Sequence, residues 1–160
     1  MRAKTLGMTA AAVAAAAVTG SLASGSARSP WYRQLRKPPY NPPQQVFPVV
    51  WPLLYADVAV VSAETIDTLR GRGDHDGARA YTTALAVNLV LNAGWSWLFF
   101  SRHWLGASAV GAAALTASSA DLSRRALAAR GAPAAPLALY PLWTAFATLL
   151  ASRIWWLNRR

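Results

Sequence analysis

The chain contains no cysteine and only two histidines, His75 and His103, among its 160 residues. The missing cysteine excludes disulfides, thiolate catalysis and thiolate metal sites. The two histidines do not have the spacing of metal ligands. His75 lies between Asp74 and Asp76, but neighbouring side chains in a glycine-rich turn rarely converge on one ion. We therefore expect no metal site.

Charge is also scarce. Charged residues make up 14% of the chain and hydrophobic residues 54%, whereas soluble domains contain roughly 25% charged residues. The net charge of +10 arises from 16 basic and 6 acidic residues. These basic residues form short clusters between apolar windows, which is the juxtamembrane pattern. We therefore expect contact with membrane lipid and exclude nucleic acid as a partner.

Five windows without charge organise the chain. A transmembrane helix needs about 20 apolar residues. Four of the windows are of about this length, and the proline-rich window 38–56 continues as an apolar helix past Asp57. The sequence thus predicts an all-α, multi-pass integral membrane protein, a five-transmembrane-helix bundle in one domain spanning 1–160. The uncharged windows are 5–27, 38–56, 80–101, 103–120 and 131–152. The helices are expected at about 5–27, 46–69, 80–101, 104–123 and 134–157, with a loop over 28–45 and a polar loop over 70–79.

The first window fits two interpretations. Arg2 and Lys4 precede an Ala/Val run that ends in small residues near Ala27. This pattern is typical of a cleaved signal peptide and also of a retained first helix.

The segment from Trp31 to Tyr55 combines aromatic, basic and proline residues. Proline has no backbone donor, so Pro38, Pro39, Pro42 and Pro43 predict extended chain or turns. A rigid, aromatic, cationic loop over a helix mouth could act as a lid over a site. The alternative is an anchor in the membrane interface, where Trp, Tyr, Arg and Lys collect.

Polar side chains occur inside two of the predicted helices. Asn88 and Asn92 share one helical face with Trp95, and this face either lines a pocket or carries interhelical hydrogen bonds. Asp57 lies roughly 16 Å into its helix at about 1.5 Å per residue. It is either a cavity carboxylate or a protonated side chain that bonds to a neighbouring helix.

Two further helices carry distinct patterns. Trp143, Phe146 and Ala147 belong to a stripe at helical spacing in the last helix, which packs as core or lines a ligand site. In the fourth helix, Ala107 and Gly111 form a small-xxx-small pattern that permits close helix approach. We therefore expect a homodimer.

The sequence resembles the tryptophan-rich sensory protein family, also called the translocator protein or peripheral benzodiazepine receptor-like family (TspO/MBR). The resemblance covers the chain after residue 30 and favours retention of the first helix. Its three segments are Trp31-Tyr32…Leu35…Lys37-Pro38…Pro42-Pro43 running into Val50-Trp51…Leu54-Tyr55; Leu91-Asn92…Trp95…Phe99-Phe100; and Trp143…Phe146-Ala147-Thr148…Ile154-Trp155…Asn158.

The resemblance implies a membrane protein that binds hydrophobic tetrapyrroles such as protoporphyrin or haem between its helices, as sensor, carrier or regulator, without a required cofactor. It implies Trp31 in the lid and a cavity lined by Trp51, Tyr55, Asn88, Asn92, Trp95, Trp143 and Ala147. The lid cations Arg33, Arg36 and Lys37 could pair with ligand carboxylates. Some positions depart from the family pattern. Gly111 stands where the family usually has an acidic residue. Ala151 and Ser152 stand where the family commonly has Asn and Tyr, so the sterol-recognition Tyr is missing.

Two alternatives to tetrapyrrole binding stay open from the sequence. One is an enzyme that degrades porphyrin in light, although the chain shows no acid–base pair, nucleophile constellation or metal site. The other is a structural or partner-binding membrane protein whose tryptophans are only interfacial.

Overall fold

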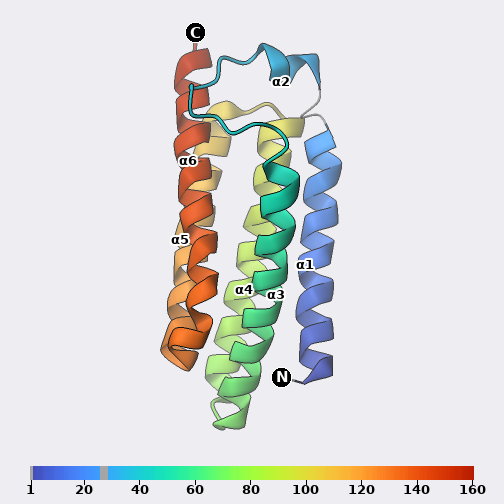
Figure 1. The fold of residues 1–160 in the computed structure, drawn as a ribbon, viewed down its shortest axis with the longest axis vertical. Helices are drawn as coiled ribbons and strands as arrows, with labels where there is room; N and C mark the ends of the chain where they lie inside the picture. Colours follow the sequence, from blue (N-terminus) through green and yellow to red (C-terminus); the bar gives the residue numbers. More distant parts are fainter. Residues whose placement is uncertain (1, 26–28) are drawn as a thin grey trace.

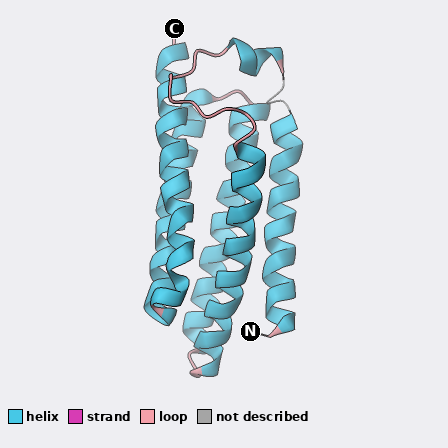
Figure 2. Ribbon diagram, viewed as in Figure 1, coloured by secondary structure: helices cyan, strands magenta, loops and turns pink. Residues whose placement is uncertain are grey.

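The computed structural model describes residues 2–25 and 29–160, and within these residues it is helical with no strand (Figure 2). The elements in chain order are α1 (Ala3–Ser24), α2 (Pro30–Gln34), α3 (Phe47–Gly71), α4 (His75–Ser96), η2 (Trp97–Ser101), α5 (Leu105–Arg130), η3 (Ala132–Ala138) and α6 (Leu139–Asn158).

The long helices α1, α3, α4, α5 and α6 lie alongside one another, and the short α2 crosses one end of the bundle (Figure 1). We call this end the lid end, because the segment 29–45, the lid, lies there with the α4–α5 junction and the end of α6. The opposite end carries the start of α1 and the turn between α3 and α4, and we call it the N-terminal end.

Four of the helical stretches in the described residues are long and apolar enough to cross a membrane. They are Ala3–Ser24, Phe47–Gly71, His75–Ser101 and Ala132–Asn158. The helix α5 has 26 residues but is not among them, because it is rich in Ala, Gly and Ser and its last turns carry Asp121, Arg124, Arg125 and Arg130. Length and composition therefore do not confirm a count of five spans.

The polar segment 70–79, expected as a loop, is mostly helical. α3 continues to Gly71 and α4 begins at His75, so only three residues separate them. The reason is local capping: Asp74 Oδ1 accepts a hydrogen bond from the Gly77 backbone N–H at 2.8 Å, and Gly73 supplies a φ of 77° that favours glycine.

The lid also contains a helix that proline content did not predict. Pro30 occupies the first turn of α2, where its missing donor costs little, and the Ser29 hydroxyl accepts from the Tyr32 backbone N–H at 3.3 Å. At the other junction, α5 runs to Arg130 rather than ending near Ser123, and the 3-10 turns of η3 precede α6.

The helix α1 is built into the bundle through its polar and small residues. The Thr9 hydroxyl donates to the Ala59 carbonyl of α3 at 2.9 Å, and the Thr5 hydroxyl donates to Asp67 Oδ1 at 2.7 Å. Near its other end, a Cβ on Gly20 would lie 3.3 Å from Ser96 Oγ of the α4 helix. These contacts join α1 to α3 and α4.

Small residues let α5 pack closely inside the molecule. Ala109 and Ala112 of α5 are buried together with Ala151 of α6, and a Cβ on Gly106 would lie 3.1 Å from Trp155 Nε1. Ala107 of the expected dimerisation pattern is exposed, and the homodimer stays a prediction.

We expect α1 to remain in the mature protein, since its hydroxyl groups bond to α3 and would otherwise leave Asp67 without these partners. The intact mass of protein extracted from membranes measures this directly. A mature N-terminus near Arg28 would contradict the prediction and favour a cleaved signal peptide.

Candidate functional site

A chain of side-chain hydrogen bonds crosses the bundle below the lid. Tyr55 Oη donates to Asn92 Oδ1 at 3.0 Å, and Asn92 Nδ2 donates to Tyr140 Oη at 2.9 Å. Tyr140 Oη in turn donates to Asn88 Oδ1 at 2.9 Å, and Asn88 Nδ2 donates to Ser119 Oγ at 3.1 Å. The chain therefore joins α3, α4, α6 and α5.

These bonds decide what the two asparagines do in this conformation. Asn88 is completely buried and Asn92 is 2% exposed, and the amide groups of both are engaged by neighbouring helices. Of the two interpretations of this face, the structure supports interhelical hydrogen bonding. Asn92 still lies next to the aromatic side chains described below through its bond to Tyr55.

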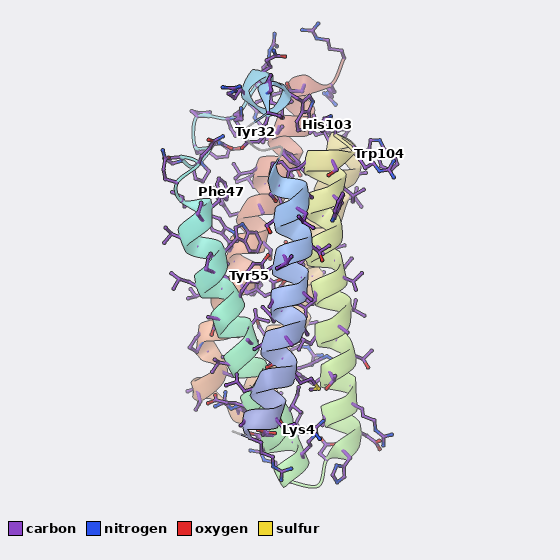
Figure 3. The ribbon with its side chains drawn as sticks, turned by 90° about the vertical axis from the view of Figure 1, so that its right-hand side faces the viewer. Lys4, Tyr32, Phe47, Tyr55, His103 and Trp104 are labelled. Atoms are coloured by element: carbon purple, nitrogen blue, oxygen red, sulfur yellow. The ribbon has the colours of Figure 1, made fainter. Side chains whose placement is uncertain are left out.

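Aromatic rings from α3 and α6 meet at the same level, and we call them the α3–α6 cluster: Phe47, Trp51, Tyr55, Trp143 and Phe146. Trp51 and Trp143 pack edge to face with ring centroids 6.4 Å apart, and Trp51 and Tyr55 lie 5.5 Å apart. Trp143 also contacts Phe47 at 5.9 Å and Phe146 at 5.7 Å. Figure 3 labels Phe47 and Tyr55 on α3, beneath the lid.

A second group of rings, the lid cluster, holds α2 against the end of α4. Trp31 packs on Phe99 at 5.9 Å, and Trp95 stacks on Phe99 at 5.6 Å with an interplanar angle of 21°. Tyr32 is buried against Phe99 and Phe100. The π-helical turn η2 carries both phenylalanines, so its wider geometry sets where the lid rests.

His103 adds a contact at the edge of the lid. Its imidazole stacks on the Trp31 indole with centroids 3.6 Å apart and planes inclined by 14°. His103 has a φ of 57°, a left-handed conformation that is uncommon outside glycine. The α4–α5 junction thus presents this ring to the lid, as Figure 3 shows for His103 near Tyr32.

Two indole N–H groups in this region have no acceptor. Trp95 Nε1 and Trp143 Nε1 are both buried and unpaired among the described residues. A buried donor without a partner costs about 1–3 kcal/mol. One indole belongs to the lid cluster and the other to the α3–α6 cluster, so unused hydrogen-bonding capacity exists on α4 and on α6.

Two predicted site residues lie apart from these rings. Ala147 is half-buried on α6, one turn after Trp143. Asp57 is half-buried on α3 with Oδ2 buried and unpaired. Within the described residues, no ring contact, hydrogen bond or ion pair connects Asp57 to either cluster, so the structure does not bring it into the site.

The three lid cations differ in what they can reach. Arg33 and Arg36 are exposed. Lys37 is folded back into the lid: its Nζ donates to the Tyr32 carbonyl at 2.6 Å and lies 4.4 Å from the centre of the Tyr32 ring. Desolvation lowers the pKa of Lys37. Its ammonium group stabilises the lid, whereas the side chains of Arg33 and Arg36 stay exposed.

Asn158, at the end of α6, fastens the other side of the lid. Its Oδ1 accepts from the Arg36 backbone N–H at 3.0 Å, and its Nδ2 donates to the Arg36 carbonyl at 2.9 Å. Nδ2 also donates to the Ile154 carbonyl at 2.7 Å, which fixes the amide orientation on α6. The lid is therefore held by rings at Trp31 and by a two-bond amide contact at Arg36.

The most evident hollows of the described surface lie away from these clusters, toward the N-terminal end. One lies between α4 and α5 and the other at the start of α4. The first is lined by Ala80, Thr83, Ala84, Val87, Ser118, Asp121 and Arg125, and the second by Arg70, His75, Ala78, Arg79, Thr82 and Thr83. Below the lid, the rings of the chain itself occupy the space between α3 and α6.

Sequence reasoning missed three contributors to this region. Tyr140 is the central member of the hydrogen-bond chain, and its signal was its position three residues before Trp143, which places it near the same face. Asn158 was recognised only as part of a motif, and its bonds to residue 36 span most of the chain. His103 gave no signal, because stacking on Trp31 depends on the fold.

Comparison with known proteins identifies relatives of the whole bundle. The model of the TspO/MBR family matches residues 8–157. The translocator protein of Ovis aries is 34% identical over 127 residues, which cover 78% of this chain and 73% of that protein. The tryptophan-rich sensory protein of Cereibacter sphaeroides is 37% identical over 90 residues, covering 56% of this chain and 51% of that protein.

Removing the Tyr140 hydroxyl should destabilise the bundle more than removing the Tyr55 hydroxyl. Tyr140→Phe leaves two buried groups unpaired, Asn92 Nδ2 and Asn88 Oδ1, and should lower the free energy of unfolding by about 2–3 kcal/mol. Tyr55→Phe removes only the hydrogen bond to Asn92 Oδ1 and should lower the free energy of unfolding by about 1 kcal/mol. Reversible unfolding in detergent micelles compares these matched changes, and equal losses would show that the chain does not act as a unit.

Asn158→Leu should loosen the lid without unfolding the bundle. Loss of both bonds to Arg36 should speed amide exchange in residues 35–41 about tenfold, since two hydrogen bonds contribute about 1–3 kcal/mol. Asn158→Asp keeps an acceptor for the Arg36 N–H but loses the donor, so its effect should be intermediate. Hydrogen–deuterium exchange measured by mass spectrometry tests this. Unchanged exchange in the leucine variant would mean that the rings alone hold the lid.

Proposed function

The chain belongs to the TspO/MBR family of membrane proteins, and from this premise we propose that it binds a hydrophobic tetrapyrrole beneath the lid. It is a multi-pass integral membrane protein. The ligand that we propose is protoporphyrin or haem, held between α3, α4 and α6, and the protein acts as a sensor, carrier or regulator of tetrapyrroles.

The unpaired indole donors carry this proposal. Trp95 Nε1 and Trp143 Nε1 are buried and lack acceptors in the described residues. In a bilayer no water reaches such groups freely, so an acceptor on a ligand would remove their cost. Ring nitrogens or carboxylates of a tetrapyrrole are acceptors of this kind.

The aromatic walls support a flat ligand. Trp51 and Trp143 already pack edge to face, and Trp95 stacks on Phe99. Binding would separate the Trp51 and Trp143 rings and replace their contact with contact to the macrocycle. Aromatic packing contributes about 0.5–1.5 kcal/mol beyond burial. Because a macrocycle offers each indole more flat surface than the ring it displaces, the exchange favours a large flat ligand.

The lid supplies charge for ligand carboxylates. Arg33 and Arg36 are exposed, and guanidinium groups can bind carboxylates through two parallel hydrogen bonds. Cysteine and histidine do not offer an axial ligand for haem iron beneath the lid: the chain has no cysteine, His75 starts α4 at the N-terminal end, and His103 stacks on Trp31. We therefore favour a metal-free porphyrin, or haem bound through its edges.

We also propose that α5 is the fifth span. Its 26 residues correspond to about 39 Å of helix, longer than a hydrocarbon core of about 30 Å. Asp121 lies nine residues before the last residue of α5 and pairs with Arg124 and Arg125 at 2.7 Å each. These charges could lie at the membrane interface while the Ala-rich part of α5 crosses the bilayer.

Changing one indole to phenyl should separate stability from binding. Trp143→Phe removes the unpaired donor but keeps an aromatic ring, so the free protein should lose little stability. Protoporphyrin binding should weaken about fivefold to tenfold, because one ligand hydrogen bond of about 1–1.5 kcal/mol is lost. Quenching of tryptophan fluorescence, titrated with porphyrin, measures the affinity. No saturable quenching in the wild type would exclude the tetrapyrrole assignment.

The lid cations provide the matched control for this titration. Arg33→Gln with Arg36→Gln should weaken binding of the porphyrin diacid far more than that of its dimethyl ester. Arg124→Gln with Arg125→Gln removes two charges at the other end and should leave both ligands unaffected. Irradiating the complex separates binding from light-dependent degradation: loss of porphyrin absorbance that requires the protein would favour the enzyme.

A further inference from the structure

The two ends of the bundle differ in charge balance. All acidic residues of the chain lie between 57 and 121, and none of them lies at the lid end. Seven basic residues of the described chain do lie at that end. They are Arg33, Arg36, Lys37, Arg102, Arg153, Arg159 and Arg160.

The N-terminal end pairs several of its cations with carboxylates of the chain. Arg79 pairs with Asp76, Arg130 pairs with Glu64, and Asp121 accepts from two arginines. The distances are 2.9 Å for Arg79–Asp76, 2.6 Å for Arg130–Glu64, and 2.7 Å for both Arg124–Asp121 and Arg125–Asp121. In contrast, the lid end has no carboxylate side chain that could form an ion pair with its cations.

Two of these cations converge on one ring. The guanidinium carbon of Arg153 lies 4.8 Å from the centre of the Trp156 ring, and that of Arg159 lies 4.9 Å from it. Like charges so placed repel one another, and the partial negative charge at the end of α6 offsets this only in part. An anion that binds both guanidinium groups would offset this repulsion.

The position of this pair on α6 indicates which anion. Arg153 and Trp156 continue an outward stripe that begins with Leu142 and Leu149, whose side chains are 66% and 52% exposed. In a membrane protein such a stripe faces acyl chains. A lipid lying along it would place its headgroup at the end of the stripe, beside Arg153 and Arg159.

Exposed tryptophans mark the same level. Trp104 and Trp155 are exposed at the lid end, and Arg102 lies 5.7 Å from the Trp104 ring. Tryptophan collects at the headgroup region of a bilayer, and guanidinium groups bind phosphate through two parallel hydrogen bonds.

We propose that the lid end binds anionic phospholipids, and that Arg153, Trp156 and Arg159 form the site for the lipid phosphate. The acyl chains lie along the Leu142–Leu149 face, and the remaining lid-end cations strengthen the attraction to an anionic leaflet. This site faces outward from α6, so it is separate from the rings beneath the lid and does not depend on the proposed tetrapyrrole function.

Native mass spectrometry of the full chain, released from detergent with equal amounts of phosphatidylglycerol and phosphatidylcholine of matched acyl chains, tests this proposal. The wild type should retain phosphatidylglycerol in preference. Arg153→Gln with Arg159→Gln should reduce this preference at least about fivefold, since one basic residue near a membrane surface accounts for roughly fivefold in binding. Arg124→Gln with Arg125→Gln, which removes the same charge at the N-terminal end, should leave the preference unchanged.

Three results would overturn the proposal. The first is equal retention of the two lipids by the wild type. The second is an equal loss in both double variants, which would indicate an effect of net charge alone. The third is displacement of phosphatidylglycerol by millimolar inorganic phosphate, which would indicate a site for soluble anions. Circular dichroism of each variant confirms that the helices are intact, and Trp156→Leu, which keeps both charges, should lose part of the preference.

Discussion

The arrangement of this bundle depends on one constraint: a polar side chain placed among apolar helices must find its partner in the protein. Asn88, Asn92 and Tyr140 satisfy one another in a continuous chain that ends at Tyr55 and Ser119. Because the bonds join α3, α4, α5 and α6 at one level, they fix the relative rotation and height of these helices. The rings on the same helices, Trp51, Trp95 and Trp143, take their positions from this framework. The site beneath the lid is therefore a consequence of hydrogen bonding, although aromatic rings form its walls.

The lid follows the same logic at the end of the bundle. Its prolines remove backbone donors, so it cannot satisfy itself as a regular helix beyond the short α2. Lys37 and Asn158 meet the polar groups that remain, Lys37 through the Tyr32 carbonyl and Asn158 through both backbone groups of Arg36. A cation that the sequence suggested for ligand binding is thus used to shape the lid, while its neighbours stay exposed. The contacts that hold the lid are therefore of two kinds, ring packing at Trp31 and Tyr32 and polar bonds at Lys37 and Arg36.

Much of this could be predicted from local pattern, and the remainder required partners distant in sequence. The windows without charged residues predicted the long helices. The spacing of Asn88, Asn92 and Trp95 predicted that these side chains share one inward face. The same spacing could not distinguish pocket from interhelical bonding, because the answer depends on Tyr140, about fifty residues later. The segment 70–79 was expected as a loop because its glycines and charges resemble a turn. The cap by Asp74 lets α4 begin at His75, and α3 runs on to Gly71, so most of the segment is helical. For Asp57 the sequence left a cavity carboxylate and a bond to a neighbouring helix both open, and its place relative to the rings depends on the rotation of α3, which sequence spacing does not give.

The two ends of the bundle carry an unequal balance of charge. Ion pairs at the N-terminal end give four of its arginines a carboxylate partner, and the pair of Arg130 with Glu64 ties α5 to α3. At the lid end the acidic residues are missing, and Arg153 and Arg159 instead share the Trp156 ring. Stability alone would favour a carboxylate beside two adjacent guanidinium groups. Its absence leaves a field of one sign around the lid, and that field attracts anions from outside the chain, whether they belong to the membrane or to a ligand approaching the rings below.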